Sequence, residues 1–212
     1  MENIITSIEI QKNNKERVNI YVDNSYFISC DSMLVYKKSL RKGQKVDLDL
    51  LKDIATEDNF SKAKNTALKY ISRCLKTESE VVKKLERAGF DEGTSQRVIE
   101  YMKSYNFVDD VEYTRLFIKE KIKKYGVTKI KYDLRNKGVN EKIVEEQLNN
   151  NDLQEMDAVI NQVASKKYQQ LKSKHEDQYI VKRKLAQFLL GKGYEYELIN
   201  RTISKVEGGE EE

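Results

Sequence analysis

The chain has 212 residues, of which 35% are charged, and a formal net charge of +4 at pH 7. No stretch is long and apolar enough for a transmembrane helix, and the N-terminal segment lacks the pattern of a secretory signal. Its two cysteines supply neither a disulfide framework nor a four-ligand zinc site. We therefore expect a cytoplasmic protein that carries no metal and no other cofactor.

Residues 1–60 predict a small β-rich lobe. Apolar and polar residues alternate along residues 4–10, and two further short apolar segments follow polar turns. Asp31 or Ser32 is suited to cap a short helix over residues 32–40. We therefore predict three strands joined by hairpins, followed by one short helix.

The rest of the chain has a helical pattern. From Ser61 onward, apolar residues recur at helical spacing, and no proline interrupts them. Thr77 and Glu80 have the spacing of a capping box, as do Asp109 and Glu112. Each pair therefore marks the predicted start of a helix.

A Leu-x-x-x-Gly step occurs three times, and its glycines are Gly89, Gly138 and Gly193. Each glycine stands where a helix needs a left-handed residue before the chain turns into the next helix. The repetition predicts a tandem array, in which each three-helix unit completes its core against its neighbours. We therefore expect a mainly α fold, elongated and curved, with the β-rich lobe at its N-terminus. The predicted parts are the lobe at residues 1–60, three three-helix units at 61–107, 108–152 and 153–206, and a disordered acidic tail at 207–212.

The sequence offers little for catalysis. It has no P-loop motif, and the glycines at 191 and 193 lack the preceding strand of a dinucleotide-binding turn. The one histidine, His175, lies among polar residues in a predicted loop. Asp109 and Asp110 resemble a carboxylate pair, but a helix cap explains them more simply. We therefore do not expect an enzyme.

Residues 119–137, here called the 119–137 stripe, carry eight basic residues against two acidic ones. Such a concentration is typical of a surface that binds a polyanion or an acidic protein, although a solvated helix face has the same composition. Tyr125 and Tyr132 lie within the stripe and are suited either to stacking on bases or to core packing. Lys182, Arg183 and Lys184 form a second basic cluster, for which a solvated face is an equal alternative.

Motifs follow one another in a specific order over residues 60–206. They are Ala67-Leu68-Lys69-Tyr70-Ile71-Ser72-Arg73, Thr77-x-x-Glu80-Val81-x-x-Lys84-Leu85-x-x-x-Gly89-Phe90, Asn106-Phe107-Val108-Asp109-Asp110, Gly126-x-x-x-Ile130-x-x-x-Leu134-x-x-Lys137-Gly138-Val139, and Phe188-Leu189-Leu190-x-Lys192-Gly193-Tyr194. In order and spacing this part of the chain resembles the RecX family, bacterial regulators of the RecA recombinase. Two departures are Asn106, where the family often has glycine, and Gly191, where it commonly has a basic residue.

The resemblance implies a regulator without chemistry of its own. RecX-like proteins lie in the groove of the RecA–single-stranded-DNA filament and inhibit RecA ATP hydrolysis and strand exchange, which modulates recombination, DNA repair and the SOS response. We accordingly expect a monomer that binds this filament, and single- or double-stranded DNA only weakly. The residues predicted to contact the filament are Arg73, Arg115, Lys121, Lys124, Tyr125, Lys129, Lys131, Tyr132, Arg135, Lys137, Lys182, Arg183 and Lys184.

Two alternatives remain open at this point. A helical module that binds nucleic acid directly, without RecA, would bind bare DNA tightly and with a steep salt dependence. A helical scaffold for some other protein would keep its function when Lys124, Lys129 and Lys131 are reversed in charge.

Overall fold

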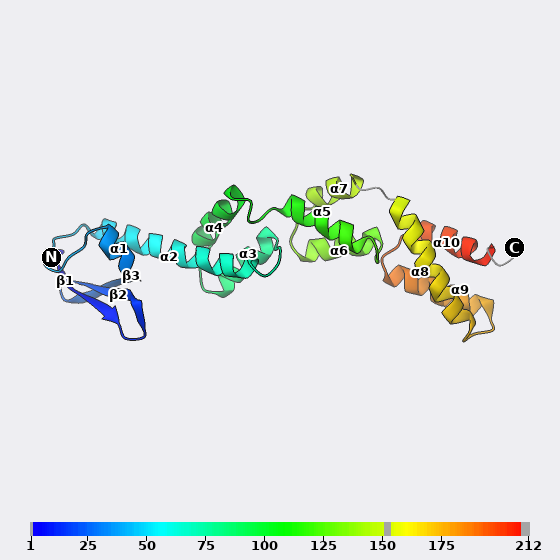
Figure 1. Cartoon of the computed structure of the whole chain (residues 1–212), viewed down its shortest axis with the longest axis horizontal. Helices are drawn as coiled ribbons and strands as arrows, with labels where there is room; N and C mark the ends of the chain where they lie inside the picture. Colours follow the sequence, from blue (N-terminus) through cyan, green and yellow to red (C-terminus); the bar gives the residue numbers. More distant parts are fainter. Residues whose placement is uncertain (1, 151–153, 209–212) are drawn as a thin grey trace. The chain divides into compact units, whose positions relative to one another are not determined.

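The computed structural model describes residues 2–150 and 154–208 (Figure 1). Within these residues the chain forms three strands and then ten helices. It divides into two compact units, one of Met1–Cys74 with Val81–Tyr105 and the other of Leu75–Glu80 with Asn106–Glu212. The strands are β1 (Ile5–Gln11), β2 (Asn14–Val22) and β3 (Ser25–Asp31); the helices are α1 (Ser32–Lys37), α2 (Leu48–Ile71), α3 (Glu78–Arg87), α4 (Glu92–Ser104), α5 (Asp110–Lys121), α6 (Val127–Asn136), α7 (Glu141–Asn149), α8 (Gln154–Lys172), α9 (Gln178–Gly191) and α10 (Tyr196–Gly208).

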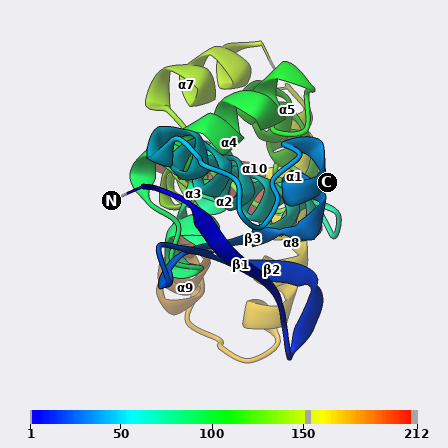
Figure 2. The ribbon, with the colours of Figure 1, turned by 90° about the vertical axis from the view of Figure 1, so that its left-hand side faces the viewer.

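The N-terminal lobe is an antiparallel sheet in the order β1-β2-β3, packed against α1 and α2 (Figure 2). Asp23 and Asn24 both have a positive φ, which suits the tight hairpin turn between β2 and β3. The polar residues 12–17 suggest a turn between the first two strands, but β2 already begins at Asn14, so the turn is shorter. The predicted three strands and short helix are therefore present in this lobe.

Helix α2 serves both the lobe and the first three-helix module. The helix begins at Leu48 rather than at Ser61, because the Asp47 carboxylate caps it by accepting from the Asp49 N–H. Its first half packs Leu51 into the core of the lobe, and its second half buries Ala63 and Ala67 beside α4. No chain break or turn therefore separates the lobe from the first module.

A buried ion pair fixes the sheet to α2. The Asp58 carboxylate accepts from Arg17 Nη1 on β2 at 3.1 and 3.2 Å, and from the Asp31 N–H at the end of β3 at 3.0 Å. Lys62, one turn further along α2, places its Nζ 2.7 Å from the same carboxylate. This carboxylate therefore satisfies groups on two strands and one helix at once.

The remaining helices form three modules of three. The first contains the second half of α2 with α3 and α4, the second contains α5 to α7, and the third contains α8 to α10. The middle helix of each module ends at a predicted glycine, and Gly89, Gly138 and Gly193 have φ values of +87°, +76° and +81°. The prediction of a mainly α fold with three three-helix units and a small β-rich lobe is thus confirmed.

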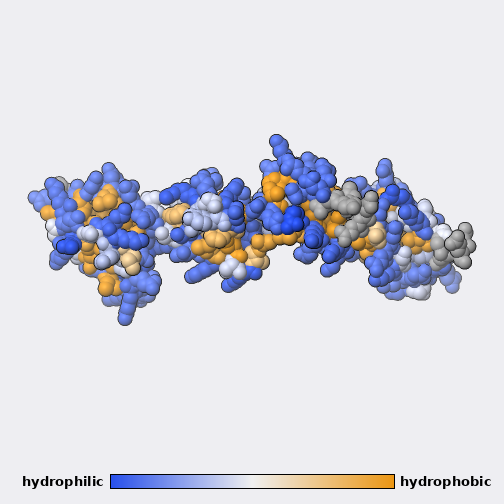
Figure 3. Space-filling model, turned by 45° about the horizontal axis from the view of Figure 1, so that its top comes forward, coloured by the Kyte–Doolittle hydropathy of each residue, from blue (hydrophilic) through white to orange (hydrophobic). Residues whose placement is uncertain are grey.

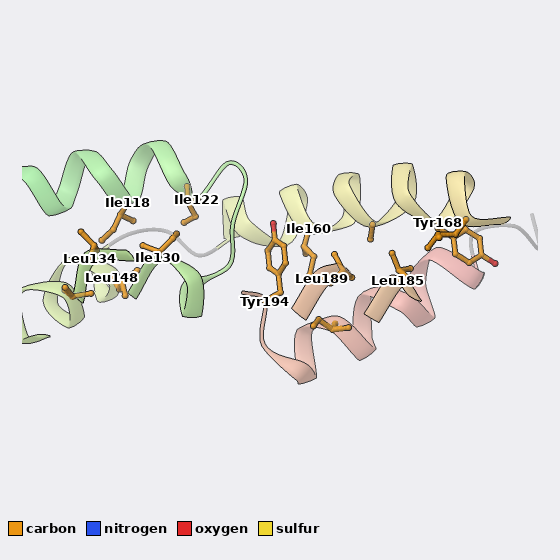
Figure 4. Packing of buried hydrophobic residues seen from close by; sticks show 14 of the residues in the cluster. Ile118, Ile122, Ile130, Leu134, Leu148, Ile160, Tyr168, Leu185, Leu189 and Tyr194 are labelled. Carbon is orange, nitrogen blue, oxygen red and sulfur yellow. The ribbon is translucent and has the colours of Figure 1, made fainter. Parts of the chain in front are cut away.

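The second and third modules share one hydrophobic core. Ile118 and Leu134 lie at its second-module end, and Leu185 and Leu189 lie in the third module, with Tyr194 between the two groups (Figure 4). Helix α10 extends to Gly208, so it includes the first two residues of the expected tail. The rest of that tail, residues 209–212, and the expected boundary at 152 and 153 lie outside the described residues.

Candidate partner-binding surface and its module junctions

The N-terminus of α3 meets the C-terminus of α6. Thr77 Oγ1 donates to the Lys137 carbonyl at 2.7 Å, and the Asp110 carboxylate accepts from the Glu78 N–H at 2.9 Å. The Cβ of any residue larger than glycine at position 138 would lie 2.2 Å from Ser79 Oγ. Glycine at position 138 thus both ends α6 and allows it to approach α3.

Only one of the two predicted capping boxes is complete. Thr77 Oγ1 accepts from the Glu80 N–H at 3.2 Å, and Glu80 Oε2 accepts from the Thr77 N–H at 3.2 Å, as the spacing predicts. Asp109 caps α5 by accepting from the N–H groups of residues 111 and 112. Its expected partner, Glu112, instead accepts from Arg115 at 2.6 Å and 2.8 Å.

Lys137 ties this junction together electrostatically. Its Nζ lies 2.9 Å from Glu80 Oε1 and 5.5 Å from the centre of the Tyr113 ring. Partial burial disfavours its charge, but the interactions with Tyr113 and Glu80 outweigh burial and raise the pKa of Lys137 to about 12. Burial alone would raise the pKa of Glu80, but the hydrogen bonds from Lys137 and from the Thr77 N–H outweigh it, so this pKa is lowered.

These shifts predict the pH range in which the pair stabilises the fold. Because the pKa of Glu80 is lowered from 4.5, its contribution is complete above pH 4.5 and is lost as the pH falls through the lowered value. Because the pKa of Lys137 is raised from 10.5 to about 12, its contribution is complete below pH 10.5 and is lost as the pH rises towards 12. The pair therefore acts fully between these limits.

We expect Glu80→Gln to lower the free energy of unfolding by about 1 kcal/mol at neutral pH. The difference from the wild type should shrink in acid, where Glu80 of the wild type is itself protonated. Urea unfolding across this pH range measures the effect, with Glu86→Gln, an exposed carboxylate on the same helix, as the control. A difference that stays constant into acid would contradict the assignment.

The N-terminus of α6 meets the C-terminus of α9 in a second junction. The Gly126 N–H donates to the Lys192 carbonyl at 3.0 Å, and the Thr128 N–H donates to the Gly193 carbonyl at 3.2 Å. Gly126 has no side chain to cap α6, so carbonyls at the end of α9 satisfy these N–H groups instead. The second and third modules are therefore joined through backbone atoms.

Half of the basic residues in the 119–137 stripe are engaged within the protein itself. Lys121 pairs with Glu120, Lys129 with Asp133, Arg135 with Glu141 and Lys137 with Glu80, at distances from 2.6 to 3.0 Å. Within the described part of the chain, the other four form no ion pair. These unpaired and exposed cations are Lys119, Lys123, Lys124 and Lys131.

Lys131 lies on another element than the other three unpaired cations. It belongs to α6, whereas the others lie at the end of α5 and in the turn that follows it. Lys131 lines a cleft of about 740 Å³ between α6, α7, α8 and α10. Glu145, Glu195 and Glu197 also line this cleft, and its Arg201 is already paired with an aspartate at 2.9 Å. Carboxylates therefore outnumber cations there, which makes it a poor site for a polyanion.

The two tyrosines of the stripe differ in their surroundings. Tyr125 is half-buried against the shared core, and Lys192 Nζ lies 5.2 Å from the centre of its ring. Tyr132 is 58% exposed, with Lys129 Nζ 5.1 Å from its ring centre. Tyr125 thus has the packing role that the sequence left open, while Tyr132 is accessible to a partner.

The remaining predicted contact residues are dispersed. Arg115 pairs with Glu112, and Lys182 with Glu207 on α10. Lys184 Nζ lies 2.8 Å from His175 Nε2, in the loop where His175 was expected. Arg73, in the turn after α2, and Arg183, on α9, are exposed, and neither has an ion pair in the described residues.

Some cations of potential importance were missed by the sequence interpretation. Lys119 and Lys123 belong to the stripe but were not among the predicted contacts. They are four residues apart, and no acidic residue lies four residues from either, so the sequence already indicates two neighbouring cations without an i, i+4 partner. Lys167 and Lys192 lie outside the stripe in sequence, and only the fold brings Lys192 to Tyr125. On the face shown in Figure 3, hydrophilic side chains cover most of the surface.

The architecture defines a class: a protein of tandem three-helix modules joined through their middle helices, with a β-rich lobe at the N-terminus. Among the described residues, no helix meets the length and apolarity that a bilayer crossing requires, and no cluster of metal-ligating side chains is present.

Comparison with known proteins identifies the family. Models of the regulatory protein RecX N-terminal domain and of the first, second and third RecX three-helix domains match residues 3–47, 63–102, 109–148 and 154–203. The chain belongs to the RecX family of regulatory proteins.

Relatives named regulatory protein RecX align along almost the whole chain. That of Clostridium acetobutylicum is 44% identical over 97% of both chains, and that of Clostridioides difficile is 36% identical over 96% of this chain and 95% of its own. A crystal structure of regulatory protein RecX covers 95% of this chain and 98% of its own, with a TM-score of 0.70 and 26% identity. A crystal structure of RecX from Lactobacillus salivarius covers 71% of this chain and 98% of its own, with a TM-score of 0.65 and 25% identity.

Proposed function

We propose that this protein binds the RecA–single-stranded-DNA filament in its groove and inhibits RecA ATP hydrolysis and strand exchange. It acts as a monomer in the cytoplasm, without catalysis of its own, and so modulates recombination and DNA repair. Membership of the RecX family supports this proposal.

One structural observation carries the proposal further. Lys119, Lys123 and Lys124 are three exposed cations at the end of α5 and in the turn that follows it, and none of them forms an ion pair in the described residues. A cluster of free ammonium groups is a surface to which a polyanion binds favourably, because each phosphate contact releases condensed counterions. The phosphates of a nucleoprotein filament provide such a polyanion.

The test is a titration of DNA-stimulated ATP hydrolysis by a bacterial RecA at fixed single-stranded DNA. We expect hydrolysis to fall at protein concentrations well below those that saturate bare single-stranded DNA at the same salt. That result would mean that the filament is the target.

A direct DNA-binding module is the second candidate, and the unpaired lysines favour it equally. In that case inhibition would begin only when the bare DNA is saturated, because the protein would compete with RecA for DNA. If the protein neither inhibits RecA nor binds DNA, both functions are contradicted. A helical scaffold for another partner would then remain.

A further inference from the structure

Two lysines outside the 119–137 stripe share one aromatic ring. Lys167 Nζ on α8 lies 5.1 Å from the centre of the Phe188 ring, and Lys192 Nζ at the end of α9 lies 5.4 Å from the same centre. Lys192 Nζ is also 5.2 Å from the centre of the Tyr125 ring. We call these four residues, Lys167, Phe188, Lys192 and Tyr125, the Phe188 row.

The second module junction creates this row. Tyr125 precedes Gly126, whose N–H donates to the Lys192 carbonyl, so the backbone contact between α6 and α9 places the Lys192 side chain on the Tyr125 ring. Phe188 and Lys192 are four residues apart on the same helix face. Contacts with the rings hold the lysine side chains in place, which reduces the conformational entropy that binding would cost them.

Other lysines that contact rings in the same compact unit serve as an internal comparison. Lys121, Lys129 and Lys137 each lie on a ring and also pair with a carboxylate. Lys167 and Lys192 lie on rings but have no carboxylate partner among the described residues. An anion can therefore approach these two lysines without displacing a carboxylate.

We propose that the Phe188 row is a binding site for the phosphodiester backbone of single-stranded nucleic acid. Tyr125 directly follows Lys123 and Lys124, two of the unpaired cations of the stripe, in the sequence, and the exposed Tyr132 ring on α6 is available for stacking on an unpaired base. Cations interspersed with aromatic rings are the pattern by which single strands are bound without regard to sequence. The choice of single-stranded nucleic acid as the polyanion rests on the proposed function.

The test measures binding of a labelled oligothymidylate by fluorescence anisotropy at several salt concentrations. Because each phosphate contact on a single strand contributes a slope of about −0.7 in the logarithmic plot against salt, Lys167→Gln with Lys192→Gln should flatten the slope by about 1.4. At about 0.1 M salt the double variant should bind on the order of tenfold more weakly than the wild type. An unchanged affinity and slope would overturn the proposal, as would a wild type that does not bind at low salt.

A matched control is available in the other compact unit. Lys64 and Arg97 also share one ring, that of Phe60, at 5.9 and 4.9 Å, but nothing connects them to the 119–137 stripe in sequence. The double variant of Lys64→Gln with Arg97→Gln should keep the wild-type affinity. An equal loss in both double variants would overturn the assignment to the Phe188 row.

A second pair of variants tests the ring itself. Phe188→Tyr keeps the aromatic face and should bind as the wild type does, whereas Phe188→Leu should weaken binding about threefold. Thermal melting checks that both variants are folded to the same extent.

Failure of the Phe188 row can be told apart from failure of the proposed function. If the wild type inhibits RecA but the Lys167→Gln, Lys192→Gln variant binds oligothymidylate as the wild type does, only the Phe188 row is overturned. If that variant loses oligothymidylate binding but the wild type does not inhibit RecA, only the proposed function is overturned.

Discussion

Reversing the charge of Lys119, Lys123 and Lys124 together is expected to weaken inhibition of RecA ATP hydrolysis on the order of 100-fold. Each replacement by glutamate removes an attraction to the phosphates of the filament and adds a repulsion in its place. The folded state should be affected little, because all three side chains are exposed and form no ion pair in the described residues. The measurement is the protein concentration that halves RecA ATP hydrolysis, at fixed DNA and salt.

A charge-matched control separates this surface from the net charge of the protein. Lys12, Lys15 and Lys42 are exposed residues of the N-terminal lobe, and their reversal changes the net charge by the same amount. We expect that variant to inhibit RecA within about threefold of the wild type. Undiminished inhibition by the variant at 119, 123 and 124 would show that the end of α5 does not contact the filament.

Gly126→Ala is expected to lower the free energy of unfolding by about 3 kcal/mol, through overpacking at the second module junction. The added Cβ would lie 2.2 Å from the Gly193 carbonyl oxygen and 2.4 Å from its carbonyl carbon. These are backbone atoms, so no side-chain rotation can relieve the clash. The φ of −79° at Gly126 is open to alanine, so the expected loss comes from the clash alone.

Gly191→Ala on α9 is the matched control for this prediction. A Cβ at Gly191 would meet nothing within 4 Å, and alanine is favoured over glycine in a helix by up to about 1 kcal/mol. We therefore expect this control to be as stable as the wild type or slightly more so. Equal unfolding free energies for Gly126→Ala and the wild type, from urea denaturation, would mean that α6 and α9 can separate without loss.

Local features of the fold were predictable from the sequence because neighbouring residues determine them. The Thr77 and Glu80 capping box requires only a spacing of three, and the glycine that ends each middle helix requires only a left-handed conformation. The start of α2 at Leu48 was missed because a charged residue, Asp58, interrupts the buried face of this helix between Ile54 and Ala63. Only the fold shows that Asp58 is buried, through its bonds to the sheet.

Features that depend on distant residues were beyond the sequence. A count of basic residues treats all eight cations of the 119–137 stripe alike, whereas Glu80, more than fifty positions away, neutralises Lys137. Likewise, Asp110 was assigned to a cap of its own helix, but its carboxylate accepts from the first turn of α3. The sequence therefore predicted where charge is concentrated, and the structure was needed to distinguish free cations from paired ones.

The continuity of α2 limits how this protein can change in length. Each residue inserted into or deleted from an α-helix turns everything beyond it by about 100° about the helix axis. A change of one residue between Asp58, which holds the sheet, and Ala63, which faces α4, would therefore rotate the lobe out of register with the first module. A substitution in this part of the helix keeps that register, whereas a single insertion or deletion does not. A change in the length of the lobe that preserves the register must therefore fall outside this helix.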